Sequence, residues 1–188
     1  AAAQNKFVEE AEKAAANEDQ YKVDLAAIAD VQDKLDAAKT TVSGYAESVQ
    51  ASFADTIAAL ENSVAELTVT AEASYKKGTS VADAAALKES AAAVVADIEK
   101  LLGDAAAAQK KYEEEAAAAA ANEAQYKLDL DAIADVQDKL DAATNTVAEY
   151  ADSVQASFVE TIDALEASVD NLTATAKASY QNGTSVAD

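Results

Sequence analysis

Large apolar side chains recur along the chain at steps of three and four residues. The first group consists of Tyr21, Leu25, Ile28, Val31, Leu35, Val42, Tyr45, Val49, Phe53, Ile57, Leu60, Val64 and Leu67. A second group consists of Leu87, Val94, Val95, Ile98, Leu101 and Leu102. Because an α-helix turns once every 3.6 residues, this spacing places each group on one face of a helix. The pattern predicts an all-α fold.

The same pattern returns 105 residues later. Residues 1–83 align without gaps with residues 106–188, and 60 of the 83 positions are identical. Every apolar position of the first group recurs, whereas substitutions such as Asp19 to Ala124 and Ala58 to Asp163 fall mainly elsewhere. Residues 84–105 occur once. We therefore expect an excerpt from a longer tandem array, in which the packing face is repeated and the outer surface varies.

Three glycine positions predict how the helices end. Gly78 and Gly183 both precede Thr-Ser-Val-Ala-Asp, as expected of a left-handed residue beyond a helix C-terminus followed by a new helix start. Ser80 with Asp83 resembles a capping box at that start. Gly44 is replaced by Glu149 in the second copy, so we expect it to need no positive φ and to lie within a helix or near its start.

The remaining boundaries are weaker in the sequence. Thr and Asn interrupt good helix formers at 39–41 and 144–146, which favours a turn there. Without that turn, residues 17–77 would form one helix of about 90 Å that needs a partner chain. The stretch 104–121 is strongly helical, with Tyr112 as its one large apolar side chain, and is either a connector or the extension of a neighbouring helix.

These boundaries predict two repeats. The first, 1–105, has core helices at about 17–40, 42–77 and 80–102. The second, 106–188, is incomplete and has a connector helix at about 104–121 followed by helices at 122–144 and 146–182. The expected architecture is a tandem array of antiparallel three-helix bundle repeats of 105 residues, forming an elongated rod.

Composition narrows the type of bundle. Of the 188 residues 52 are alanine, none is proline and four are glycine. Alanine forms helices well but buries little area, so narrow helical bundles with few connections are favoured over a thick globular core.

The charge excludes several classes of partner. The formal net charge is -21, with 14 basic residues, all of them lysine, against 35 acidic ones. This balance disfavours binding to nucleic acid or to an anionic membrane surface. The longest apolar runs are six residues, as at Ala116 to Ala121, and are too short for membrane insertion. No signal peptide is visible, and a chain that opens on Ala1 is expected to be an excerpt or a processed product.

Candidate chemistry is sparse because histidine, cysteine and arginine are all absent. Ser74 and Lys77 have Ser-x-x-Lys spacing, but the second copy has Asn182 in place of the lysine. Asp129 with Asp131, and Glu113 to Glu115, are carboxylates that attract calcium in other settings, yet adjacent helical residues point in different directions. We expect no catalytic, cofactor-binding or metal-ligating residue, and we expect that the chain is not an enzyme.

Two other features have structural interpretations. Tyr21, Tyr45 and Tyr75 recur as Tyr126, Tyr150 and Tyr180, and we expect them at the core boundary with the hydroxyl reaching water rather than on a binding surface. Glycosylation sequons begin at Asn171 and Asn182 but are missing from the first copy, which favours chance.

A three-helix period near 105 residues is similar in length to spectrin repeats, although the tryptophan typical of that family is absent. Alanine-rich segments such as NEAQYKLDLDAI at 122–133 resemble the helical surface repeats of bacterial adhesins and stalk proteins. Streptococcal alanine-rich repeats share this character at a different period. The resemblance implies a structural spacer at the cell surface or outside the cell, with neighbouring repeats as its partners. The alternative is a helical binding module that recognises an unidentified protein through an exposed helix face.

Overall fold

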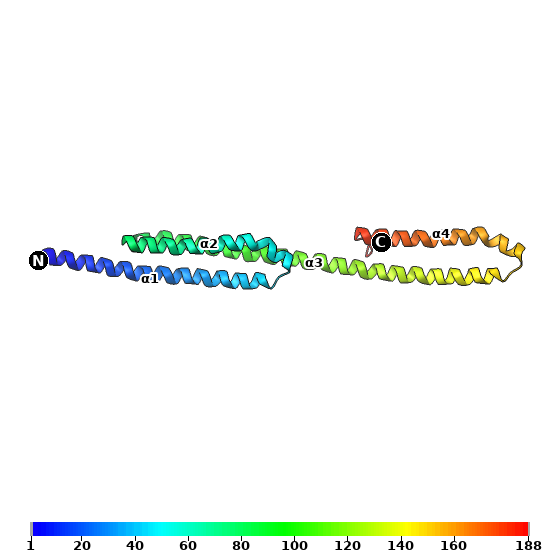
Figure 1. Cartoon of the computed structure of the whole chain (residues 1–188), viewed down its shortest axis with the longest axis horizontal. Coiled ribbons are helices and arrows are strands. Elements are labelled where there is room, and N and C mark those ends of the chain that lie inside the picture. The colour runs from blue at the N-terminus through cyan, green and yellow to red at the C-terminus, as the bar shows by residue number, and fades with distance from the viewer. Residues whose placement is uncertain (1, 188) are drawn as a thin grey trace. The chain divides into compact units, whose positions relative to one another are not determined.

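The structure, a computed structural model, describes residues 2–187, and these form four helices without a strand (Figure 1). The helices are α1 Ala2–Ser43, α2 Glu47–Lys77, α3 Ser80–Ala148 and α4 Asp152–Asn182. The predicted all-α class is confirmed. Long helices form because alanine loses no side-chain entropy and no proline removes a backbone donor. Within 2–187, no helix combines the length and the apolar character needed to cross a membrane.

The chain divides into two compact units, Ala1–Tyr112 and Glu113–Asp188. Helix α3 contributes its first part to one unit and its second part to the other. We describe each unit separately.

In the first unit, α1, α2 and the first part of α3 pack around one apolar core (Figure 1). Its buried residues are Ile28, Val31, Leu35 and Ala38 of α1, Leu60, Val64, Leu67 and Ala71 of α2, and Leu87, Ala91, Val94, Ile98 and Leu101 of α3. The alanines in this set let the helices approach closely. Most of the predicted packing face lies here, but Leu25 is exposed.

The second unit contains the second part of α3 and helix α4, which contact each other through Asn122 and Tyr180. Its buried apolar residues are Leu140, Val169 and Ala176. Three helices thus surround the first core, whereas two helices form the second unit among the residues that the structure describes.

The turn expected at 39–41 lies further along the chain, at 44–46, and its counterpart lies at 149–151 rather than 144–146. The threonines do not end α1 because their hydroxyls donate to carbonyls of the preceding turn: Thr40 to Asp36 O at 2.9 Å and Thr41 to Ala37 O at 3.0 Å. Gly44 follows the end of α1 and lies in the turn. Its φ is not positive, as expected. Of the two expected positions, within a helix or near its start, the first is wrong, because Gly44 lies three residues before α2 begins.

Two other predicted boundaries are wrong. The first helix begins at Ala2 rather than near residue 17, although residues 3–16 are exposed. Helix α3 does not end at Leu102 but continues through Gly103, so 104–121 is an extension of the preceding helix. Gly103 has an ordinary helical φ, and the strong helix formers after it continue the helix. Leu101 and Ala105 stay buried on either side of it.

Candidate functional site

A cluster of polar and aromatic residues joins all three helices at the α2–α3 turn of the first unit. Asn17 of α1 is buried, and its Nδ2 donates to Tyr75 O of α2 at 3.0 Å. Its Oδ1 accepts from the Ser80 amide, at the start of α3, at 2.8 Å. One amide side chain therefore satisfies a carbonyl at the end of one helix and an amide at the start of the next, both of which lack partners within their own helices.

Gly78 gives this turn its backbone shape. Its φ is +74°, and its amide donates to Tyr75 O at 3.0 Å, while the Thr79 amide donates to Ser74 O at 2.9 Å. These two bonds form a Schellman motif, which confirms the predicted left-handed glycine.

Asp83 receives two hydroxyl hydrogen bonds in the same turn. Thr79 Oγ1 donates to its Oδ2 at 2.6 Å and Ser74 Oγ at 2.7 Å. The Thr79 bond, then the Ser74 bond, and the nearby Lys77 charge lower the pKa of the Asp83 carboxyl. The predicted capping box is wrong, because Ser80 lies one residue inside the helix. Helical hydrogen bonding begins at Thr79 O, which accepts from the Asp83 amide at 2.9 Å.

The rings of Tyr21 and Tyr75 stack at the same turn, with ring centroids 4.5 Å apart and planes 14° from parallel. Tyr21 is half-buried against the core, and Tyr75 is 38% exposed. This position agrees with the predicted core boundary, but the helical spacing did not indicate the stacking. We call Asn17, Tyr21, Tyr75, Gly78 and Ser80 the turn cluster.

The turn cluster recurs in the second unit. Asn122 Nδ2 donates to Tyr180 O at 2.9 Å, and Asn122 Oδ1 accepts from the Ser185 amide at 2.8 Å. Tyr126 and Tyr180 stack at 4.5 Å, and Gly183 has a φ of +73°. The counterpart of Asp83 is residue 188, which lies outside the described residues.

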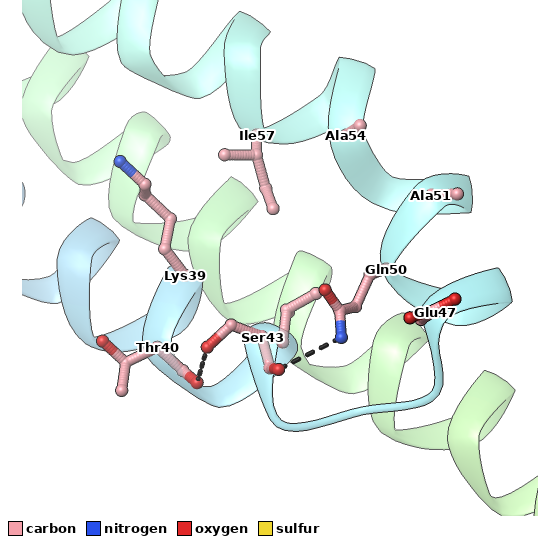
Figure 2. A pocket seen from close by; sticks show the side chains of 9 residues that line it. Lys39, Thr40, Ser43, Glu47, Gln50, Ala51, Ala54 and Ile57 are labelled. Carbon is pink, nitrogen blue, oxygen red and sulfur yellow. Dashed lines mark hydrogen bonds between the residues drawn. The ribbon is translucent and has the colours of Figure 1, made fainter.

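Side chains of α2 and α3 close the α1–α2 turn, and Figure 2 shows the hydrogen bond from Gln50 of α2 to the Ser43 carbonyl. Gln50 Nε2 donates to Ser43 O at 3.1 Å and to Tyr45 O at 2.7 Å. On α3, Gln109 Oε1 accepts from the Ala46 amide at 2.9 Å. The α1 and α2 residues at this turn also line an open groove of about 710 Å³, which includes Ala54 and Ile57.

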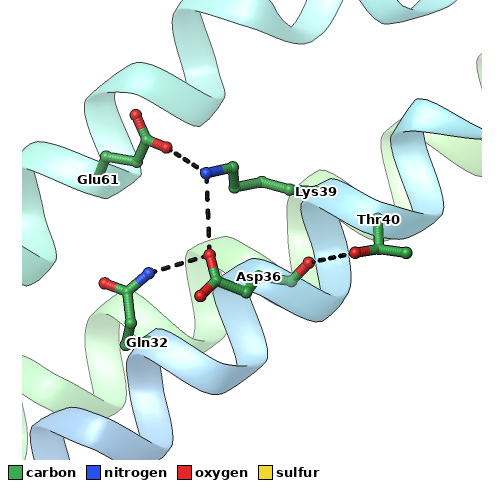
Figure 3. A network of polar contacts seen from close by, with 5 residues as sticks. All are labelled: Gln32, Asp36, Lys39, Thr40 and Glu61. Carbon is green, nitrogen blue, oxygen red and sulfur yellow. Dashed lines mark hydrogen bonds and ion pairs between the residues drawn. The ribbon is translucent and has the colours of Figure 1, made fainter.

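Lys39 links α1 to α2 next to this groove (Figure 3). Its Nζ lies 2.5 Å from Glu61 Oε1 and 3.8 Å from Asp36 Oδ1. The Glu61 hydrogen bond and charge, followed by the Asp36 charge, raise the pKa of Lys39. Gln32 Nε2 donates to Asp36 at 3.1 Å and orients it. The second unit has Thr144 in place of Lys39 and therefore lacks this bridge.

The candidate Ser-x-x-Lys residues do not form a nucleophile and base pair. Ser74 is buried, and its hydroxyl donates to the Asp83 carboxylate rather than to Lys77. The arrangement holds a turn together.

The acidic candidates lie along helix α3. Asp129 accepts from Gln125 Nε2 at 2.8 Å, and Asp131 is exposed. Glu113, Glu114 and Glu115 are exposed on the same helix. Among residues 2–187, no group of three or more acidic side chains has a geometry that could hold a metal ion.

The other candidates lie on the surface. Tyr45 is half-buried, whereas Tyr112 and Tyr150 are 45% and 48% exposed. The sequon residues Asn171 and Asn182 are exposed on α4. Neither asparagine takes part in the turn cluster.

The chain matches no protein-family model, no curated protein and no solved structure. The sequence analysis missed three polar residues that hold the turns, Asn17, Gln50 and Gln109. Each is identical in the other copy, as Asn122, Gln155 and Gln4. Their recurrence in both copies was the available signal, because a surface free to vary had no reason to keep them.

Proposed function

We propose that this chain is a structural spacer or stalk repeat of a bacterial extracellular or cell-surface protein. In this proposal the repeating element is an antiparallel three-helix bundle of 105 residues, and successive bundles form a rod whose length and stiffness are the function.

The observation that supports the proposal is the continuity of α3. One helix, Ser80–Ala148, supplies the third helix of the first core and the first helix of the second unit. A helical connection resists bending, whereas a linker rich in glycine and serine behaves as a flexible coil. A repeat whose last helix continues as the first helix of the next repeat suits a spacer.

The turn cluster supports the same proposal. It commits buried polar groups to holding helix ends. Asn17 and Asn122 make matching bonds in the two copies, so both turns are closed in the same way.

Small-angle scattering tests the rod. A compact domain of this length has a radius of gyration near 16 Å. Two bundles in line, joined by a helical connector, would give a value near 30 Å. We expect the larger value, and a value below about 20 Å would contradict the spacer. Ala116→Pro, in an exposed stretch of α3, should alter the scattering curve by breaking the connector, whereas Ala116→Leu should not.

A second experiment separates spacing from recognition by a protein partner. The repeat is replaced, within its parent protein, by an unrelated helical bundle of equal length. Retained activity of the parent protein supports the spacer. Lost activity supports the binding module, since only the surface chemistry differs.

A further inference from the structure

The second unit exposes apolar residues whose counterparts are buried in the first unit. We call Val136, Val154, Phe158, Leu165 and Leu172 the open face, and each is between 41% and 49% exposed. The counterparts Val31, Val49, Leu60 and Leu67 are buried, and Phe53 is partly buried against the core. Apolar positions that the α3–α4 pair covers, such as Leu140 and Val169, remain buried.

The first unit shows what covers these positions. Val31, Leu60 and Leu67 belong to the same core cluster as four residues of the first part of α3, namely Leu87, Val94, Ile98 and Leu101. We propose that the open face is a docking site for an amphipathic helix with the apolar pattern of residues 84–112. Its contact residues follow steps of four and three from Leu87 through Ala91, Val94, Ile98 and Leu101 to Ala105, all of them buried in the first unit.

The turn after α4 repeats hydrogen bonds of the turn that precedes α3. After Gly183, the Thr184 amide donates to Ser179 O and the Ala187 amide donates to Thr184 O, both at 2.8 Å. The corresponding bonds at Thr79 and Ala82 open α3 in the first unit, at 2.9 Å each. Asn122 holds the Ser185 amide as Asn17 holds that of Ser80. The turn therefore fixes where the docked helix enters and which way it runs.

A second anchor lies at the other end of the open face. In the first unit, Gln109 accepts from the Ala46 amide, which precedes α2. Ala151 occupies that position before α4, with φ of −63° and ψ of 145° and no side-chain cap. A helix with the pattern of 84–112 brings a glutamine to the Ala151 amide.

Charge favours the same occupant. Residues 113–188 carry sixteen carboxylates against three lysines, whereas residues 84–112 carry four of each. A helix of this composition adds no net charge to an acidic unit, and its lysines reduce repulsion at the contact. The inference rests on the proposed three-helix repeat but concerns a binding site rather than spacing.

Single cysteines test the site, because the chain has none of its own. Leu165→Cys reports on the open face. Val159→Cys is the matched control on α4, since Val159 is 50% exposed and its counterpart Ala54 lines the α1–α2 groove, to which α3 does not contribute. A copy of residues 84–112 is fused after Asp188, and thiol labelling rates are measured with and without this extension.

We expect the extension to slow labelling of Leu165→Cys at least about tenfold, because a covered thiol reacts only after local opening. Labelling of Val159→Cys should stay the same. Replacing the glutamine of the fused copy by alanine should weaken the protection about fivefold, the effect of one lost hydrogen bond.

Three results would overturn the docking site. The first is that the extension leaves the labelling rate of Leu165→Cys unchanged. The second is that a fused copy with aspartate at the positions of Ile98 and Leu101 slows labelling equally well. In the third, the unextended chain already protects Leu165→Cys in proportion to its concentration, so that a second copy is the occupant. The scattering test of the spacer uses the unextended chain and stands independently of these outcomes.

Discussion

Leu60 in the first unit is 5% exposed, whereas Leu165, at the same position of the repeat in the second unit, is 49% exposed. The apolar neighbours Ile57 and Val64 recur as Ile162 and Val169, and both leucines lie on one helix of an antiparallel pair. The difference is the first part of α3, which packs on Leu60 and has no counterpart on Leu165 among the described residues. Burial at this position therefore depends on a third helix rather than on the residue itself.

The turn cluster behaves differently. Its hydrogen bonds and stacked tyrosines have matching distances in the two units, although only the first unit has a third helix among the described residues. These contacts lie within a helix pair and the turn that follows it. Comparison of the two units thus distinguishes contacts that form within a helix pair from contacts that need a third helix.

The largest expected effect comes from the leucines. Leu60→Ala should destabilise the first unit by about 2–5 kcal/mol, because it removes buried methyl groups and leaves a cavity. Leu165→Ala should cost less than about 1 kcal/mol, as expected at an exposed position. Urea denaturation followed by amide hydrogen exchange in each unit measures both. Equal costs would show that the open face is covered in solution.

The asparagines should instead behave alike. Asn17→Ala leaves the Ser80 amide without its acceptor and should cost about 2 kcal/mol in the first unit. Asn122→Ala should cost the second unit a similar amount, since its bonds are the same. Asn17→Asp keeps the acceptor oxygen but places a buried carboxylate against Tyr75 O, so its cost should be at least as large. Hydrogen exchange near each turn is the measurement, and a large difference between units would mean that the cluster depends on the third helix.

The glycines sharpen the comparison within the first unit. Gly78→Ala should cost about 1 kcal/mol, because alanine is strained at a φ of +74° even though the added Cβ meets no atom within 4 Å. Gly44→Ala should be neutral or stabilising, since Gly44 has no positive φ and an added Cβ would lie 3.4 Å from Thr41 O. Urea denaturation compares the two variants, and equal effects would contradict the distinction.

Charge should affect the second unit more than the first. Nineteen carboxylates face eleven lysines in residues 1–112, against sixteen and three in residues 113–188. Adding salt, or lowering the pH toward about 5, should therefore raise the melting temperature, most for the second unit. Asp83 does not oppose this trend. Because folding lowers the pKa of the Asp83 carboxyl, its ionised form stabilises the fold at pH values above the unfolded pKa of about 3.9. That contribution is lost only as the pH falls through the folded pKa. A melting temperature lowered by both treatments would show that ion pairs outweigh the repulsion.

The smallest expected effect concerns the bridge that only the first unit has. Lys39→Thr introduces the residue of the second unit and should lower the melting temperature slightly at pH 7, less so at about 0.5 M salt. The raised pKa of Lys39 means that its contribution is present below its unfolded pKa of about 10.4 and is lost as the pH rises through the folded value. Thermal denaturation at neutral and alkaline pH checks the sign, and a loss that persists in salt would indicate packing by the lysine stem.

Features that follow from local chemistry could be predicted from the amino-acid sequence. Apolar spacing indicated the helical class and most of the core face, because the period of a helix does not depend on its surroundings. Gly78 and Gly183 could be identified as left-handed because few other residues adopt that φ after a helix.

The other features depend on contacts between helices. The α1–α2 turn lies at 44–46 because Thr40 and Thr41 bond back onto their own helix and Gln50 closes the turn from α2, a choice that propensity does not encode. Helix α3 passes through Gly103 because its buried face continues on both sides. Asn17 is buried because two other helix ends meet at its amide. Leu60 and Leu165 differ in exposure for the same physical reason: burial is a property of the partners that pack on a side chain, and one of those partners lies far away in the sequence.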